Sequence, residues 1–248
     1  MTQLTYEHPL NEKLRTYLRL EYLLNQLQQL TPLQTEWQQQ AFFNTLFDLI
    51  EVLDRNDIRP DLIKDCERSE TALVKWASHP SVADDKLQAL LQQTVRLQTE
   101  LLRVGKFVSG LKDDKFLSPL RQRFAVPGGT CYFDLPQLQY WFNLPAELRQ
   151  HAASQWCAEF GLLQQALQLV LQFCRGKGQF NSVTADNGFY QSNTEQHELL
   201  RIRYQPQHGA YPTVSGNKYR YAIRFMLLSD DSGRCSSEKT ISFELACC

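Results

Sequence analysis

The side chains best placed for a chemical role are basic residues that occur in stretches of sequence without acids. Residues 199–229 contain no aspartate or glutamate and five basic residues: Arg201, Arg203, Lys218, Arg220 and Arg224. From residue 218 to 225 basic and aromatic or apolar residues alternate, so a β-strand would place Lys218, Arg220 and Arg224 on one face. If the apolar face is buried, the basic face points outward and suits an acidic protein or a phosphate backbone.

A second stretch, residues 115–133, carries Lys115, Arg121 and Arg123 and again has no acid. Acidic residues gather elsewhere, notably at Asp48, Glu51, Asp54, Asp57, Asp61 and Asp65. Because the formal net charge is only -1, an electrostatic function would come from this segregation of charge. The simpler alternative is that these basic residues are solvated surface groups, partly neutralised by acids such as Glu198 and Glu244.

Sequence signatures of catalysis are absent. The chain has no phosphate-binding loop, no His-Glu-x-x-His and no Gly-x-Ser-x-Gly. The 7 cysteines include no Cys-x-x-Cys, and none of the 5 histidines shows metal-ligand spacing, so we expect reduced, mostly buried thiols. We therefore predict no enzyme activity, no metal and no cofactor, although a site assembled from distant residues stays open.

The elements that would position the basic residues are mostly helices in the first part of the chain. Asn11 can cap a helix that follows Pro9 and ends near residue 30, with Arg15 and Arg19 on a face separate from its apolar stripe. Apolar periodicity predicts further helices at residues 37–53, 60–77, 84–104, 134–141, 145–160 and 162–174. His79-Pro80 should end the helix at residues 60–77. The turn signal at residues 127–129 predicts a hairpin or an irregular excursion near residues 124–133.

Period-two alternation replaces helical periodicity after residue 176. It predicts antiparallel strands at residues 200–204, 218–225 and 240–245, with a hairpin loop at residues 229–233 between the last two. Residues 4–6 could add a short strand. The predicted class is α+β, mainly α: a helical body at residues 7–176 and a small antiparallel β-sheet domain at 177–248, joined by the N-terminal strand at 3–6.

Neither a membrane nor a secretory address is indicated. No apolar run approaches the ~20 residues that span a bilayer, and the first residues lack the basic and apolar regions of a signal peptide. We expect a cytoplasmic protein.

Several ungapped blocks resemble one known family. The blocks are EHPLNEKLRTYLRLEYLL, LRQRFAVPGG, FDLPQLQYWFNLP, NGFYQ, YAIRFMLL and FELACC, and they run from residue 7 to 248. Together they resemble the ZapD family of cell division proteins, which associate with the tubulin-like protein FtsZ. The resemblance implies a cytoplasmic homodimer at midcell. The homodimer would bind the C-terminal region of FtsZ and bundle FtsZ protofilaments in the Z-ring during septation. It implies no cofactor, no nucleic acid and no membrane.

The resemblance also implies partner-binding residues. The matching basic positions are Arg19, Arg55, Lys115, Lys218, Arg220 and Arg224, and the acid-free stretch adds Arg121 and Arg123. Lys115 stands where other members carry arginine, which removes the bidentate guanidinium fork. Gln139 stands where some members have histidine.

Two questions stay open at this point. A nucleic-acid-binding module is the alternative function for the basic strand face, but it would need aromatic rings exposed beside the arginines. The surface that joins a homodimer is also open, because the helices predicted at 37–53 and 84–104 both have more apolar positions than one core requires.

Overall fold

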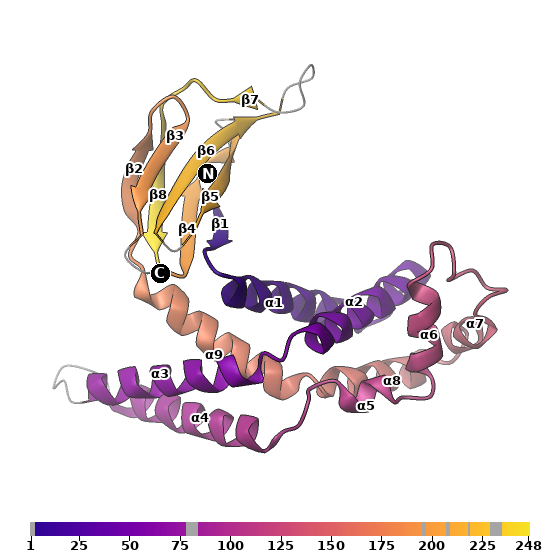
Figure 1. The fold of residues 1–248 in the computed structure, drawn as a ribbon. Helices are drawn as coiled ribbons and strands as arrows, with labels where there is room; N and C mark the ends of the chain where they lie inside the picture. Colours follow the sequence, from indigo (N-terminus) through magenta and orange to yellow (C-terminus); the bar gives the residue numbers. More distant parts are fainter. Residues whose placement is uncertain (1–2, 78–83, 195–196, 207–208, 218, 229–234) are drawn as a thin grey trace. The chain divides into compact units, whose positions relative to one another are not determined.

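A computed structural model describes the chain apart from residues 1–2, 78–83, 195–196, 207–208, 218 and 229–234 (Figure 1). The chain divides into two compact units: Arg19–Val170, and Met1–Leu18 together with Leu171–Cys248. Among the described residues the first unit is helical, whereas antiparallel strands dominate the second. The predicted class, α+β and mainly α, is confirmed, while the domain boundary at 176–177 stays a prediction.

The helices follow the predicted apolar periodicity closely. They are α1 (Glu12–Leu30), α2 (Glu36–Arg55), α3 (Arg59–Ala77), α4 (Asp84–Arg103), α5 (Ser109–Lys112), α6 (Leu117–Phe124), α7 (Pro136–Phe142), α8 (Ala146–Ala158) and α9 (Gly161–Lys177). The helices α5 and α6 were not predicted, because they are too short to show a repeat. The proposed break at His79-Pro80 lies outside the described residues.

Side-chain caps fix where two of the long helices begin. The Asn11 Oδ1 atom accepts a hydrogen bond from the Leu14 amide at 2.8 Å, as expected of the cap before α1. The Thr35 side chain accepts from the Gln38 amide, and the Gln38 side chain accepts in turn from the Thr35 amide. This reciprocal capping box satisfies backbone donors that would otherwise have no partner at the start of α2.

Aromatic rings form the centre of the helical unit. Phe43 on α2 is fully buried, and its ring contacts a set of neighbours at centroid distances of 5.1–6.2 Å. The set comprises Phe42, Phe47, Phe116, Phe124, Trp141, Phe142 and Trp156. These rings come from α2, α6, α7 and α8 and from the turn before α6, so one cluster holds the short helices against α2.

Residues 124–133 form the irregular excursion, and the hairpin alternative is wrong. Backbone hydrogen bonds close successive turns, among them Gly129 N to Val126 O at 2.9 Å and Cys131 N to Gly128 O at 3.2 Å. Gly128 has φ 74°, a left-handed conformation that glycine adopts without strain. No strand is assigned anywhere in this described segment.

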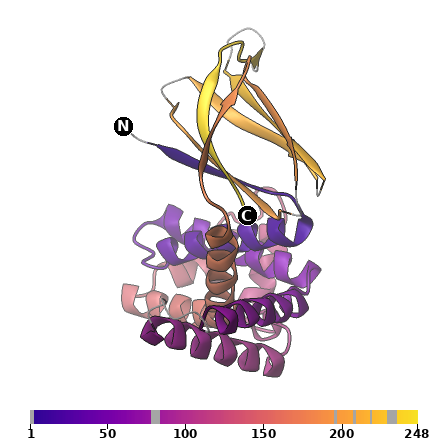
Figure 2. The ribbon, with the colours of Figure 1, turned by 90° about the vertical axis from the view of Figure 1, so that its left-hand side faces the viewer.

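The second unit contains two antiparallel sheets where the sequence predicts one. The first sheet has the order β1 (Leu4–Pro9), β4 (Leu199–Tyr204), β8 (Ile241–Cys247), β2 (Asn181–Ala185). The second sheet has the order β3 (Phe189–Asn193), β6 (Arg220–Leu227), β5 (Ala210–Gly216), and β7 (Cys235–Ser236) also pairs with β6. The strong twist of the strands is visible in Figure 2.

Apolar side chains from both sheets share one core. Ile202 and Phe243 come from the first sheet, Ile223 and Phe225 from the second, and all are at most 4% exposed. The Phe225 and Phe243 rings lie 5.2 Å apart between centroids and so connect the sheets. The predicted hairpin between β6 and β8 is wrong, because β6 pairs with β7 while β8 belongs to the other sheet; its loop at 229–233 lies outside the described residues.

Candidate partner-binding surface

Strand β6 positions two of the predicted basic residues on one exposed face. Tyr221, Ile223 and Phe225 are at most 3% exposed, whereas Arg220 and Arg224 are exposed. The two arginines are four residues apart, or roughly 13 Å along a strand. The predicted alternation is therefore present from Arg220 onward.

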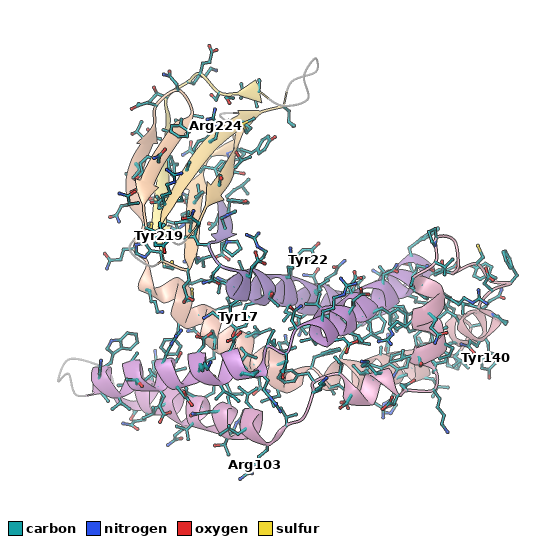
Figure 3. The ribbon with its side chains drawn as sticks, viewed as in Figure 1. Tyr17, Tyr22, Arg103, Tyr140, Tyr219 and Arg224 are labelled. Atoms are coloured by element: carbon teal, nitrogen blue, oxygen red, sulfur yellow. The ribbon has the colours of Figure 1, made fainter. Side chains whose placement is uncertain are left out.

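Arg224 has neutral neighbours only, among the described residues. Its guanidinium carbon lies 5.1 Å from the centroid of the Phe189 ring, and its Nη1 donates to Ser236 Oγ at 3.2 Å. Neither contact compensates its positive charge. Figure 3 labels Arg224 partway along β6.

Arg220 lines a polar cavity of about 350 Å³ at the end of the second sheet. The cavity walls also include Gln191, Ser215 and Asn217. The Asn217 Oδ1 atom accepts from the Arg220 amide at 3.2 Å, which fixes the backbone that carries the guanidinium. A guanidinium beside amide and hydroxyl groups can bind a carboxylate.

Tyr219 departs from the predicted alternation. It was expected on the buried face with Tyr221, but it lies in a bend before β6 and is 67% exposed (Figure 3). The regular strand geometry that enforces alternation begins one residue later, at Arg220. Lys218, the third member of the predicted basic row, lies outside the described residues.

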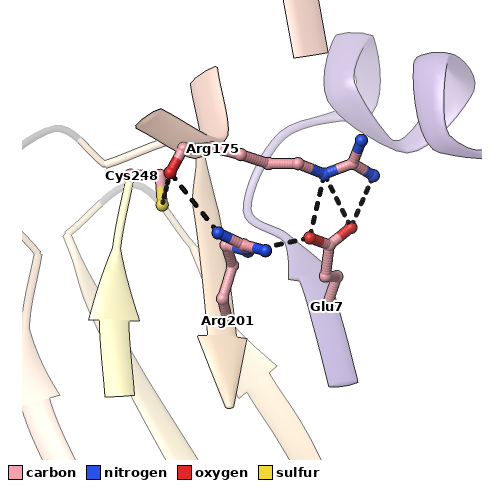
Figure 4. A network of polar contacts seen from close by, with 4 residues as sticks. All are labelled: Glu7, Arg175, Arg201 and Cys248. Atoms are coloured by element: carbon pink, nitrogen blue, oxygen red, sulfur yellow. Dashed lines mark hydrogen bonds and ion pairs between the residues drawn. The ribbon is translucent and has the colours of Figure 1, made fainter. Parts of the chain in front are cut away.

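Arg201 and Arg203 would add to this face if their strand paired beside it, but the structure shows that it does not. Their strand β4 belongs to the first sheet, where both arginines meet carboxylates. The Arg203 Nη1 atom lies 3.7 Å from Glu244 Oε2, and the Arg201 Nε atom lies 2.9 Å from Glu7 Oε1. Glu7 also binds Arg175 at 2.7 Å, so one carboxylate lies between two guanidinium groups (Figure 4).

The two sheets therefore differ in how their arginines are compensated. The four strands of the second sheet contain no aspartate or glutamate. In the first sheet, Glu7 and Glu244 are ion-paired with the arginines of β4. The uncompensated charge of the strands is thus carried by the second sheet.

In the helical unit, two predicted residues line one cavity together. Arg55 and Arg121 border a space of about 390 Å³ whose walls also include Asp48, Glu51 and Asp54. Arg55 forms an ion pair with Glu51 on the preceding turn of α2. This cavity has mixed charge, whereas the sequence predicted a basic surface.

Ionisable groups at this cavity influence one another. Lys112 Nζ donates to Asp54 Oδ1 at 2.6 Å, and this hydrogen bond holds the pKa of Asp54 below its usual value, with a smaller contribution from Arg121. Partial burial raises the pKa of Asp48, and the neighbouring Glu51 adds to the effect.

The remaining predicted residues of the helical unit are dispersed. Arg19 on α1 and Lys115 in the turn before α6 are both exposed. Arg123, also exposed, lies 3.9 Å from Asp134, which is a weak surface pair. Sequence reasoning missed the exposed aromatic side chains close to Arg123 in the chain: Tyr132, Phe133 and Tyr140. These three side chains are 49–84% exposed.

Comparison with known proteins decides what kind of protein carries this surface. A family model for the cell division protein ZapD matches residues 18–224. The chain is 41% identical over 248 residues to the cell division protein ZapD of Vibrio vulnificus, covering all of both chains. It is 40% identical over 243 residues to the ZapD of Photobacterium profundum, 98% of each chain, and 40% identical over 243 residues to that of Pectobacterium carotovorum, 98% of this chain and 96% of the relative.

The chain belongs to the ZapD family of cell division proteins. The resemblance recognised in the sequence blocks is thereby confirmed. ZapD proteins are non-enzymatic, so the prediction that the chain is not an enzyme is confirmed as well. All of the predicted partner-binding residues, from Arg19 to Arg224, fall inside the region that the ZapD model matches.

The described part of this ZapD-family chain lacks two further features. Outside the gaps named above, no group of three or more histidine, cysteine, aspartate or glutamate side chains could hold a metal ion. No helix in the described part of the chain has both the length and the apolar character needed to cross a membrane.

Proposed function

We propose that this chain is a homodimer that binds FtsZ and crosslinks its protofilaments into bundles, and so promotes Z-ring assembly. It acts in the cytoplasm at the division site, without a cofactor. The binding residues are Arg19, Arg55, Lys115, Arg121, Arg123, Lys218, Arg220 and Arg224. The C-terminal region of FtsZ is the proposed contact.

The observation that carries this proposal is the uncompensated charge of the second sheet. Arg220 and Arg224 point outward from a strand whose other face is buried, in a sheet whose strands contain no acid. The β-sheet core beneath them fixes the spacing of their backbone positions, so a partner that binds has to order only the side chains. A partner with acidic residues spaced along an extended segment would match this row.

Bundling follows from bivalency. A homodimer carries two copies of the basic surface, so one protomer can hold one filament while its mate holds another. Because a filament offers many repeated sites, each contact can be weak, with an affinity in the micromolar range or about -8 kcal/mol. Slower GTP hydrolysis by FtsZ would be a consequence of bundling, since the chain itself makes and breaks no bond.

Co-sedimentation with FtsZ polymers tests the proposal. The variants Arg220→Glu and Arg224→Glu should each reduce the amount pelleted, with an apparent affinity weakened about tenfold or more, because reversal replaces attraction by repulsion. Arg103→Glu is the matched control, since Arg103 is an exposed arginine of α4 outside the proposed surface (Figure 3). If Arg220→Glu and Arg224→Glu pellet as the unmodified protein does, the second sheet is not the binding surface.

One observation favours a second candidate function, a nucleic-acid-binding module. The exposed Tyr219 lies beside Arg220 and could stack on an unpaired base. At the other arginine, however, the Phe189 ring is already covered by the guanidinium of Arg224. A mobility-shift assay with single-stranded DNA at low and moderate salt separates the two candidates, and we expect no stable complex at moderate salt.

A further inference from the structure

The cavity of about 390 Å³ between α2 and α6, called the α2–α6 cavity below, has walls of both charges. Its ionic and aromatic lining residues are Phe47, Asp48, Glu51, Asp54 and Arg55 of α2 and Arg121 and Phe124 of α6. The Phe47 and Phe124 rings lie 5.1 Å apart between centroids, so the two helices are in direct contact at this cavity.

Two of the acids at the cavity already have a basic partner. Glu51 forms an ion pair with Arg55, and Asp54 Oδ1 accepts a hydrogen bond from Lys112 Nζ at 2.6 Å. Each pair joins one charge of each sign, so neither pair leaves a net charge for a ligand to meet.

Asp48 and Arg121 have no such partner. In the part of the chain that the structure describes, neither side chain forms a hydrogen bond or an ion pair. Partial burial raises the pKa of Asp48, and the nearby Glu51 carboxylate adds to the effect, so the negative charge of Asp48 is disfavoured where it stands. One acid and one base of the cavity are therefore available for a ligand.

These two groups lie towards opposite ends of the α2–α6 cavity. The Phe124 ring contacts Phe47, which directly precedes Asp48 in α2. Arg121, one turn earlier in α6, is close enough to add to the effect of Lys112 in lowering the pKa of Asp54. Asp48 and Asp54 are six residues apart, or roughly 9 Å along α2. The cavity is thus acidic near Asp48 and basic near Arg121.

A ligand that carries both charges matches this arrangement better than a ligand with one. A carboxylate alone would be attracted by Arg121 but repelled by Asp48, and an ammonium or guanidinium group alone would experience the reverse. A lysine or arginine side chain suits the acidic end, because its methylene groups can pack against the partly exposed ring of Phe124.

We propose that the α2–α6 cavity binds a segment of the partner in which a lysine or arginine stands close to an acidic residue, with the basic side chain at Asp48 and the acidic side chain at Arg121. The inference rests on the proposed function, in which the partner is FtsZ. It adds a binding role for an acid, Asp48, whereas the proposed function names only basic residues.

Co-sedimentation with FtsZ polymers tests the role of Asp48. The variant Asp48→Asn should weaken the apparent affinity about threefold, because the basic group of the ligand loses its opposite charge. A partner that presents only acids would give the opposite result, since removal of a negative charge from this surface would then strengthen binding. Arg121→Gln should also weaken binding, so that removing either sign of charge acts in the same direction.

Two control variants separate the charge of Asp48 from other effects. Asp48→Glu keeps the charge and should bind as the unmodified protein does. Glu147→Gln removes the same charge from an exposed position on α8 that does not line the cavity, and it should not weaken binding. Thermal unfolding shows whether the variants are folded. Asp48→Asn should not lower the Tm at pH 7, because a carboxyl whose pKa is raised by folding is more stable in its neutral form.

The outcomes distinguish this inference from the proposed function. An Asp48→Asn variant that pellets as well as the unmodified protein, or better, would overturn the site for a basic group. A loss shared by Asp48→Glu or by Glu147→Gln would overturn it too, because the charge at this position would not be responsible. If Arg220→Glu and Arg224→Glu reduce pelleting while Asp48→Asn does not, the proposed function stands and this inference alone fails. An unmodified protein that does not pellet with FtsZ polymers would refute the proposed function and this inference together.

Discussion

The variant Glu7→Gln should destabilise the β unit, because it removes one negative charge from between two positive ones. The Glu7 carboxylate accepts from Arg175 Nε and from Arg201 Nε, both at 2.9 Å, and from Arg175 Nη2 at 2.7 Å (Figure 4). Arg201 Nη1 also donates to the Arg175 carbonyl at 3.4 Å. These contacts join β1, β4 and the last turn of α9, three segments far apart in sequence.

The expected cost follows from burial. Breaking a fully buried ion pair by removing one partner costs about 3–5 kcal/mol, because the other charge is left uncompensated. Here the side chains of Glu7, Arg175 and Arg201 are 19%, 25% and 21% exposed, so water screens part of the remaining repulsion. The glutamine also keeps one acceptor oxygen. We therefore expect a loss of about 2 kcal/mol in the free energy of unfolding, equivalent to a fall in Tm of roughly 4–8 °C.

Calorimetry and urea denaturation measure this loss, with Glu244→Gln as the control. Glu244 pairs with Arg203 at 3.7 Å in the same sheet and is 38% exposed, so its replacement should cost less than about 0.5 kcal/mol. Replacing Arg201 by Gln in the Glu7→Gln background should cost less than the sum of the single changes, since it removes a charge that has lost its partner. Equal costs for Glu7→Gln and Glu244→Gln would refute this reasoning.

Three further predictions follow from other parts of the molecule. Pelleting with FtsZ polymers should weaken as the salt concentration rises from ~50 to ~300 mM, and Arg220→Glu should flatten that dependence, because screening acts on the charge that the variant removes. Thr35→Ala should cost about 1 kcal/mol in urea denaturation, because it removes the cap of α2; a cost near zero would mean that the capping box contributes nothing. In the native protein at pH 8, Cys131 and Cys235 should react with iodoacetamide while Cys174 should not, as mass spectrometry would show. Burial raises the pKa of Cys174 to about 12, so only about one molecule in ten thousand carries the reactive thiolate at that pH.

The elements that the sequence predicts well are those whose signal is local. The start of α1 could be read from Asn11 because a helix cap is made by residues three apart, and the long helices could be read from apolar periodicity. The outward direction of Arg220 and Arg224 was predictable because strand alternation is a property of the backbone. Each of these features needs only a few consecutive residues.

The features that could not be predicted depend on which distant segments meet. The sequence predicts that an N-terminal strand joins the β domain, but not that this strand pairs with β4, and that pairing places Arg201 opposite Glu7 in the register. It likewise does not show that β6 and β8 belong to separate sheets. Short polar strands such as β3, with the sequence FYQSN, carry too few apolar residues for period two to stand out.

The pairing of β4 explains why counting acid-free stretches overestimated the basic surface. The stretch 199–229 has no acid of its own, yet its two halves separate into different sheets. The first half meets Glu7 and Glu244, acids from the opposite ends of the chain, and is neutralised. The second half meets strands that have none. Exposed charges of one sign create a potential that attracts groups of the opposite sign, so the position of Arg220 and Arg224 beside acid-free strands is the physical argument for an acidic partner.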